Sequence, residues 1–379
     1  MIGNRVSLYI HVPFCTKKCP YCHFFVQPNS EDSQNIFLSS LIREWDLRSP
    51  LLLEKEIVSI YFGGGTPSLL PAKEIENILS FIRKGPGRVS PSCEITLEAN
   101  PENVSLASMQ DFLKAGINRV SMGVQSFDDS LLQTLRRTHN SEKAKKALDF
   151  ISQAGVSNVS IDLMYELPHQ TLKTWETSLL EVKNLPITHL SLYNLVFEPG
   201  TLFHKKSKLL SPTLPSEEDS LQMLNLAVQH LESFGLNRYE ISAFSKPGYE
   251  SLHNVGYWTG RPFLGLGPSA FSYFEGRRFQ NIAHLKKYET ALLQNTFPEN
   301  FEESLPFEKK QKELLAVELR LLRGVDLSLF QEKNGILSTS LQDSIKNLLL
   351  KNWLKQNNAQ LSLSEEGLLF YDSVASELI

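Results

Sequence analysis

The sequence predicts an α/β protein built around a parallel sheet, with a smaller helical module at its C-terminal end. Between residues 6 and 195, six short β-rich runs alternate with helical patterns. Repeated β–α units require parallel strands joined by right-handed crossovers. Six units favour an incomplete barrel or an open parallel sheet over a closed eight-stranded barrel. The 379 residues, 41% hydrophobic and 21% charged, are sufficient for a large core.

Each element is assigned from its own residue pattern, strands from β-branched and aromatic runs and helices from apolar periodicity. The expected strands are Val6–His11, Ile57–Phe62, Cys93–Glu98, Arg119–Val124, Asn158–Leu163 and His189–Tyr193. The expected helices are Gln34–Leu47, Ala72–Arg83, Leu106–Ala115, Asp129–Leu135, Ser141–Gln153 and Leu172–Asn184. Ser105 and Thr171 suit helix starts, and Gly116 and Gly155 suit helix ends.

The remainder of the chain changes character twice. After a proline-rich break at 197–215 we expect a helix at Glu217–Phe234, a strand at Arg238–Ala243 and a glycine-rich segment. Beyond Pro298 we expect an amphipathic helix at Lys309–Arg323, shorter helices, and a final helix at Ser364–Glu377. The expected domains are a core at 1–235, a connecting segment at 236–304, and an α-rich, winged-helix-like module at 305–379.

Composition excludes several classes of protein. A net charge of −4 gives no general attraction to nucleic acid, and no apolar run reaches the ~20 residues that a membrane span needs. The charge leads us to expect no nucleic-acid partner, and because no leader precedes the first strand we expect a cytoplasmic protein. Four cysteines in a reducing compartment indicate metal or redox use rather than disulfides. Cys93, which opens an apolar strand, is expected in the core.

The other three cysteines lie within eight residues, in the segment Cys15-Thr-Lys-Lys-Cys19-Pro-Tyr-Cys22. Three thiolates are one ligand short of a closed tetrahedral site, so one position remains for a ligand that is not protein. Zinc with His11 or His23 as fourth ligand is one alternative, and buried structural cysteines are another. The pattern favours an iron–sulfur cluster, which normally takes four thiolates and would here leave one iron open.

Polar groups or bare backbone follow all six expected strands. The strand exits are the cysteine loop, Gly63-Gly64-Gly65-Thr66, Glu98-Ala-Asn100, Gln125-Ser126, Asp162 and Tyr193-Asn194. Because the carboxyl ends of parallel strands share one edge, these exits predict one site. The glycine run lacks the Gly-Lys-Ser/Thr of a phosphate-binding loop. It indicates close approach of a ligand to the backbone, the alternative being a simple strand-to-helix turn.

These residues resemble the radical S-adenosylmethionine (SAM) family, in the branch that contains oxygen-independent coproporphyrinogen III oxidase. The cluster motif corresponds to Tyr9-x-His11-x-Pro13-Phe14-Cys15-x3-Cys19-Pro-Tyr21-Cys22. Further matches are Phe62-Gly-Gly-Gly-Thr-Pro67, Leu97-Glu-Ala-Asn-Pro101, Ser121-Met-Gly-Val-Gln-Ser-Phe127, Leu135-Arg-Arg-Thr-His139 and Ile161-Asp-Leu-Met-Tyr-Glu-Leu-Pro168. The resemblance covers nearly the whole chain and implies an incomplete (β/α)6 radical-SAM barrel.

The resemblance also implies a role for each matched residue. Cys15, Cys19 and Cys22 would bind a [4Fe–4S] cluster whose open iron is chelated by SAM. Electron transfer from the cluster would cleave SAM, which implies an electron donor such as flavodoxin or ferredoxin. The implied SAM contacts are Gly64, Gly65 and Thr66 at the methionine end, Arg137 at the carboxylate, Glu98, Gln125 and Asp162 at the amino group or ribose, and Tyr9 and Tyr21 along the cofactor.

Phe24 distinguishes two branches of this family. The decarboxylating oxidases typically carry C-x3-C-x2-C-x-C and an N-terminal segment, whereas here Phe24 stands two beyond Cys22 and about five residues precede the first strand. The heme chaperone branch, HemW, has C-x3-C-x2-C-x-F and an H-N-x-x-Y-W motif, matched at His253–Trp258. An imidazole can ligate heme iron, so His253 is a candidate heme contact. The alternative is a hydrogen-bonded interior histidine.

The main functional expectation is a carrier that binds heme, one [4Fe–4S] cluster and SAM, and passes heme to an unidentified acceptor protein. The main alternative is an enzyme that oxidatively decarboxylates coproporphyrinogen III to protoporphyrinogen IX. A third is another radical-SAM reaction, such as methyl transfer. Whether the chain is an enzyme stays open at this stage.

Overall fold

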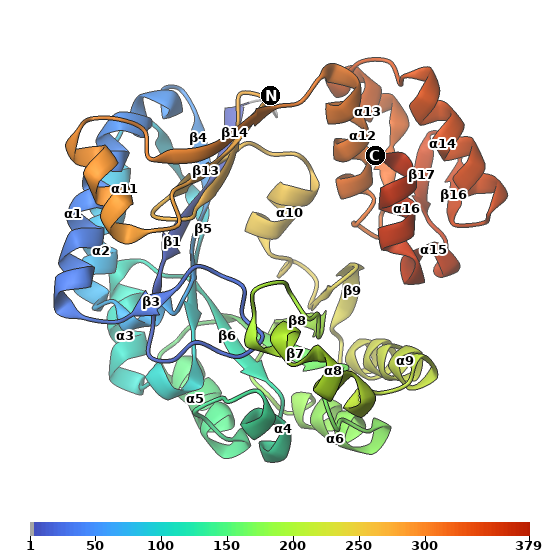
Figure 1. Cartoon of the computed structure of the whole chain (residues 1–379), viewed down its shortest axis with the longest axis horizontal. Coiled ribbons are helices and arrows are strands. Elements are labelled where there is room, and N and C mark those ends of the chain that lie inside the picture. Colours follow the sequence, from blue (N-terminus) through green and yellow to red (C-terminus); the bar gives the residue numbers. More distant parts are fainter. Residues whose placement is uncertain (1–3) are drawn as a thin grey trace.

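The computed structural model describes residues 4–379, and its main sheet has twelve strands. Six parallel strands follow one another across it in chain order. They are β1 (Arg5–Val12), β4 (Glu56–Gly64), β5 (Arg88–Ala99), β6 (Arg119–Gln125), β7 (Asn158–Tyr165) and β8 (His189–Asn194). Right-handed crossovers in unbroken strand order place the helices on one face, and Figure 1 shows them around the outside. This is the arrangement of an incomplete barrel, and the six expected strands are confirmed.

The outer layer consists of helices whose apolar stripes face the sheet. They are α1 (Glu31–Arg48), α2 (Ala72–Lys84), α3 (Leu106–Ala115), α4 (Asp129–Thr134), α5 (Ser141–Gln153), α6 (Leu172–Val182) and α9 (Glu217–Ser233). In α3, the Ser105 hydroxyl accepts a hydrogen bond from the Ser108 amide, and Gly116 ends the helix with a φ of 112°. Within residues 4–379 no helix has the length and apolar character needed to cross a bilayer.

Both edges of the six-stranded parallel sheet are extended by further strands, most of them antiparallel. On one edge β11 (Phe263–Leu266) pairs in parallel with β1, and antiparallel strands follow. These are β12 (Phe271–Phe274), β13 (Arg277–Asn281) and β14 (Glu299–Ser304). On the other edge β8 pairs with β10 (Ala243–Ser245), which pairs with β9 (Asn237–Glu240). The segment expected to be a connection thus continues the main sheet, while the domain boundaries at 235 and 304 stay a prediction.

Shorter elements connect these layers. They are β2 (Phe14–Cys15), β3 (Gln27–Pro28), α7 (Leu202–Lys205), α8 (Ser207–Leu210), α10 (Leu252–Trp258), α11 (Leu285–Leu293), and single 3-10 turns at Ser49–Leu52, Pro67–Leu69, Pro101–Asn103 and Ser211–Thr213. The single strand expected at Arg238–Ala243 is in fact two strands, because the chain turns at Ile241–Ser242 and β10 pairs antiparallel with β9.

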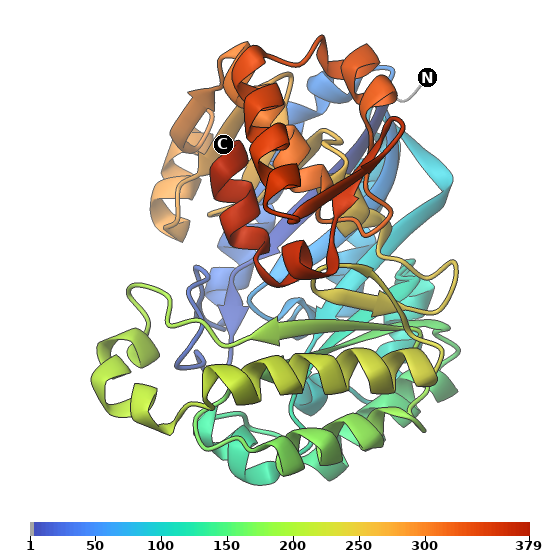
Figure 2. The same ribbon diagram turned by 90° about the vertical axis from the view of Figure 1, so that its right-hand side faces the viewer.

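The C-terminal residues form their own small hydrophobic core, and Figure 1 shows their helices and strands as a separate group beside the barrel. The elements are α12 (Phe307–Glu318), β15 (Val325–Asp326), α13 (Leu327–Asn334), α14 (Thr339–Leu350), β16 (Leu354–Asn357), β17 (Gln360–Leu363), α15 (Glu365–Leu369) and α16 (Tyr371–Leu378). The first six follow the helix–strand–helix–helix–strand–strand order of a winged helix. The final helix expected at Ser364–Glu377 is divided in two at Phe370. Figure 2 shows this module in front of the upper barrel.

A buried ionic network attaches α1 to the antiparallel extension. The Arg48 guanidinium donates to Glu44 at 2.9 Å, to Glu299 at 3.0 Å and to the Asn281 side chain at 3.0 Å. The Glu44 carboxylate also accepts from the Gly267 amide at 2.7 Å and from the Tyr288 hydroxyl at 2.6 Å. Glu44 and Arg48 are almost completely buried, so each charge depends on the other for compensation.

We predict that Arg48→Ala lowers the free energy of unfolding by about 3–5 kcal/mol, because it leaves the Glu44 carboxylate buried without its cation. Urea unfolding measures this change. The matched control is Lys73→Ala, which removes an exposed ion pair with Glu76 and should leave the unfolding midpoint unchanged. Equal midpoints for wild type and Arg48→Ala would show that the network is not stabilising.

Candidate cluster and cofactor site

The cysteine loop begins where β1 ends and is held by the end of β4. The Gly65 amide donates to the Val12 carbonyl at 2.8 Å, and the Thr66 amide donates to the Phe14 carbonyl at 2.7 Å. The Thr66 hydroxyl also lies 3.5 Å from the Cys15 sulfur. The first cysteine is therefore positioned by a neighbouring strand exit as well as by its own loop.

The end of β4 lies so close to β1 and the cysteine loop that only glycine fits at Gly64 and Gly65. A Cβ atom on Gly64 would lie 2.5 Å from the His11 ring, and one on Gly65 would lie 2.5 Å from the Phe14 carbonyl oxygen. Gly64 also has a φ of 105°, where side chains are strained. The close approach expected of a ligand is thus made in this structure by the protein's own β1 and cysteine loop.

A cavity of about 450 Å³ opens at the carboxyl ends of the six parallel strands. Eleven of the thirteen expected site residues line it, namely Cys15, Cys19, Tyr21, Cys22, Gly64, Gly65, Thr66, Glu98, Gln125, Arg137 and Asp162. Its volume lies within the range of small-molecule pockets. The strand exits that sequence analysis brought together therefore do lie around one space.

Arg137 joins several parts of this cavity. Its guanidinium donates to the Asn100 side chain at 2.5 Å, to the Gly123 carbonyl at 2.8 Å and to the Cys19 sulfur at 3.4 Å. Its Nε is buried and has no hydrogen-bond partner among residues 4–379. Buried donors are normally satisfied, so this cation retains capacity for a ligand.

Two buried carboxyl groups, Glu98 and Asp162, line the same cavity as the cysteines. Burial raises the pKa of Glu98 to about 7, although its oxygens accept hydrogen bonds from the Tyr61 hydroxyl at 2.8 Å and the Gly64 amide at 3.1 Å. Burial likewise raises the pKa of Asp162 to about 6. A cationic ligand would favour the ionised form of both groups.

Burial also raises the pKa of the Cys15 and Cys22 thiols. Each neighbouring cysteine adds to the effect at Cys15, so the three sulfurs lie within electrostatic reach of one another. Thiolates in this environment require a compensating cation, which a metal centre provides. The donor set therefore fits a metal cluster.

Three residues of this cavity, Asn100, Tyr193 and Asn194, were expected at strand exits but were given no individual role. Asn100 connects two of the predicted residues, because it donates to the Thr66 hydroxyl at 3.0 Å and accepts from Arg137. Tyr193 and Asn194 also line the cavity. All three stand at strand exits, which was the available signal. Gln125 has a φ of 70°, an unfavourable backbone conformation of the kind that concentrates at functional sites.

The zinc alternative needed His11 or His23 as fourth ligand, and the exposed His23 makes no side-chain hydrogen bond within residues 4–379. The two ring nitrogens of His11 lie 3.0 Å from the Tyr9 hydroxyl and 2.9 Å from the Phe25 carbonyl, so both are engaged. Across residues 4–379 no three His, Cys, Asp or Glu side chains are arranged to hold a single metal ion. A four-iron cluster differs, because each thiolate binds a different iron and the sulfurs stand further apart.

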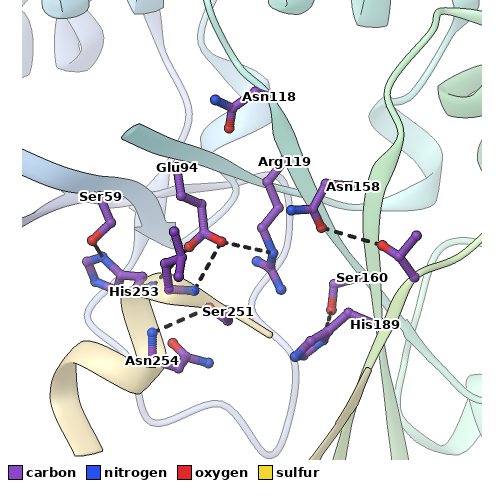
Figure 3. A network of polar contacts seen from close by, with 12 residues as sticks. Ser59, Glu94, Asn118, Arg119, Asn158, Ser160, His189, Ser251, His253 and Asn254 are labelled. Carbon is purple, nitrogen blue, oxygen red and sulfur yellow. Dashed lines mark hydrogen bonds and ion pairs between the residues drawn. The ribbon is translucent and has the colours of Figure 1, made fainter. Parts of the chain in front are cut away.

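The other two expected site residues, Tyr9 and His253, do not line this cavity. The Tyr9 ring stacks beside Tyr61, with centroids 6.2 Å apart, and faces a second cavity described below. His253 is buried, and its ring nitrogens lie 3.0 Å from the Ser59 hydroxyl and 2.8 Å from the Tyr257 hydroxyl. Figure 3 shows Glu94 holding the backbone of the same residue. This geometry is that of an interior histidine.

We predict that His253 makes the protein less stable to acid. Burial lowers the pKa of His253 to about 3, so between pH 6.5 and 3 the unfolded chain binds a proton that the folded chain does not, and stability falls with falling pH. From pH 6.5 to 5 the unfolding free energy of wild type should fall by about 2 kcal/mol relative to His253→Asn. Urea unfolding at several pH values tests this.

The matched control is His204→Asn, at an exposed histidine of α7, which should not change the pH profile. Parallel profiles for wild type and His253→Asn would mean that His253 is protonated in the folded protein and is not held as described.

Comparisons with known proteins place the chain in a family. The Radical SAM superfamily profile matches residues 9–182. The heme chaperone HemW of Bacillus subtilis is 32% identical, with 97% of each chain covered. HemW of Escherichia coli is 30% identical, again with 97% of each chain covered. The solved coproporphyrinogen III oxidase HemN of E. coli superposes with a TM-score of 0.86 at 23% identity, covering 100% of this chain and 91% of that one. The chain belongs to the HemW family of radical SAM proteins.

Proposed function

We propose that this protein is a heme chaperone that binds one [4Fe–4S] cluster, SAM and heme, and passes heme to an acceptor protein. The observation that supports it is similarity to heme chaperones over 97% of both chains, C-terminal module included. The likeness to the oxidase HemN is in fold alone, since identity there is 23%. The acceptor and an electron donor, of the flavodoxin or ferredoxin kind, belong to the same proposal.

The cysteine loop would hold the cluster by three thiolates. Cys15, Cys19 and Cys22 bind three irons, and Arg137 beside Cys19 offsets the negative charge. The position two beyond Cys22 carries Phe24, whose side chain is half exposed and cannot ligate iron. Within this loop the fourth iron therefore has no protein ligand and stays open to SAM.

The remaining groups of the cavity suit the charges of SAM. The Arg137 fork, with its unpaired Nε, suits a carboxylate. Glu98 and Asp162 suit the amino group, the ribose hydroxyls and the sulfonium charge, because a cation stabilises their ionised forms. When bound to a reduced cluster, SAM supplies radical chemistry. The protein's own contribution is to position these groups and to exclude water from the cavity.

Anaerobic reconstitution with iron and sulfide tests the proposal directly. Heme and SAM are added to the reconstituted protein, and the Soret band, porphyrinogen consumption and 5′-deoxyadenosine release are followed together. We expect a shifted Soret band without consumption of coproporphyrinogen III. Steady decarboxylation of coproporphyrinogen III would instead establish the oxidase. Absence of any Soret change would refute heme binding.

We predict that Cys19→Ala abolishes the broad iron–sulfur absorption while the far-ultraviolet circular dichroism is retained, because Cys19 is part of none of the hydrophobic core clusters of the described residues. The matched control is Cys93→Ala, which removes a buried strand thiol that burial holds protonated, with a pKa of about 12. This control should keep the full iron content. Equal iron and sulfide content in the Cys19→Ala protein would overturn the ligand assignment.

A further inference from the structure

A second cavity, of about 760 Å³, lies beside the cysteine loop. Its walls come from four parts of the chain, namely β1, the loop residues 23–25, the edge strands β11–β14 with the end of α10, and α12 of the C-terminal module. It shares His23 and Phe24 with the cluster cavity. The two cavities are thus neighbours separated by the end of the cysteine loop.

The lining of this second cavity is aromatic. Nine of its 23 lining residues are Phe, Tyr or Trp, against 10% of the whole chain. Phe24, Phe271 and Phe301 remain between 42% and 50% exposed, although such rings are normally buried. The Nε1 of Trp258 is buried without a hydrogen-bond partner among residues 4–379. Exposed rings gathered in one hollow indicate a surface for a flat apolar ligand.

The charged side chains of the cavity are of two kinds. Arg278 is neutralised, because it pairs with Glu303 at 2.5 Å and with Glu313 at 2.6 Å. Arg261 and Lys310 make no ion pair within residues 4–379. Arg261 uses only Nη1, which donates to the Ser7 hydroxyl and the Leu252 carbonyl. Two unpaired cations at one aromatic cavity suit a ligand with two carboxylates.

An imidazole is also available. Of the two histidines that line the cavity, His11 has both ring nitrogens engaged. His23 is exposed, makes no side-chain hydrogen bond within residues 4–379, and packs on Phe24 with centroids 4.6 Å apart. An imidazole of this kind can ligate heme iron. His253, by contrast, lines neither cavity.

We propose that the second cavity holds the porphyrin, with its two propionates on Arg261 and Lys310 and with His23 as the protein ligand of its iron. This proposal rests on the heme chaperone function. It names the site and places the iron next to the iron–sulfur centre. It also makes the C-terminal module one wall of the site, through Lys310 on α12.

The test compares heme with its dimethyl ester, which lacks the two negative charges. Soret titrations are made on the reconstituted protein with its cluster. Wild type should bind heme about tenfold or more tightly than the ester, because charged hydrogen bonds are lost with the ester. Combining Arg261→Gln with Lys310→Gln should weaken heme binding by a similar factor and abolish the preference. The control is Lys309→Gln, at the neighbouring exposed lysine.

The iron ligand is tested by spectroscopy. His23→Ala should shift the Soret band and remove the spectral signature of histidine ligation, while the iron–sulfur absorption is retained. The control is His204→Ala, at an exposed histidine that lines neither cavity. If the double variant does not fold, the Lys310→Gln single variant and the ester comparison on wild type still decide the question.

The outcomes separate the two proposals. The proposed site is overturned if wild type binds heme no more tightly than the ester. It is also overturned if the folded variants keep the wild-type heme affinity and His23→Ala keeps the iron spectrum. In both cases the chaperone function stands. No heme binding by wild type overturns both.

Discussion

The site depends on the pairing of β1 with β4. These parallel strands are in register from Ser7 with Ser59 to Val12 with Gly64, and the amides of Gly65 and Thr66 continue the contact into the cysteine loop. There is no room for side chains between these segments. The loop is therefore held against the strand end by backbone groups, which cannot change rotamer, and the first thiol is positioned before any metal arrives.

The second constraint is electrostatic. Thiols, a guanidinium and two carboxyl groups share a largely buried cavity in which each charged form needs a partner. Burial raises the pKa of Glu98 to about 7 and of Asp162 to about 6, and Arg137 keeps a donor unpaired. A cluster and a zwitterionic sulfonium ligand would supply the missing partners. The cavity therefore suits occupants that carry both positive and negative charge. An apolar substrate would leave the cavity's charged groups without partners.

Much of this could be predicted from the sequence, because the six strands carry strong apolar runs and the polar groups stand where those runs end. Strands β11–β14 were missed, since runs of four to six residues containing glycine or several charges give a weak alternation. His253 was a heme candidate on its motif alone. Its partners, Ser59 and Glu94, are more than 150 residues away in the chain, so only the fold shows that it is enclosed. Tyr9 was expected along the cofactor, and only the fold shows that it lines the second cavity instead.

The most direct measurement of the central claim is electron–nuclear double resonance on the reduced, reconstituted protein with SAM labelled with ¹⁵N at the amino group and ¹⁷O at the carboxylate. An iron site with only three thiolate ligands should bind the methionine end of SAM, so both labels should couple to the cluster spin. A cluster signal that is unchanged by labelled SAM, or preparations that contain zinc and no iron, would contradict the account.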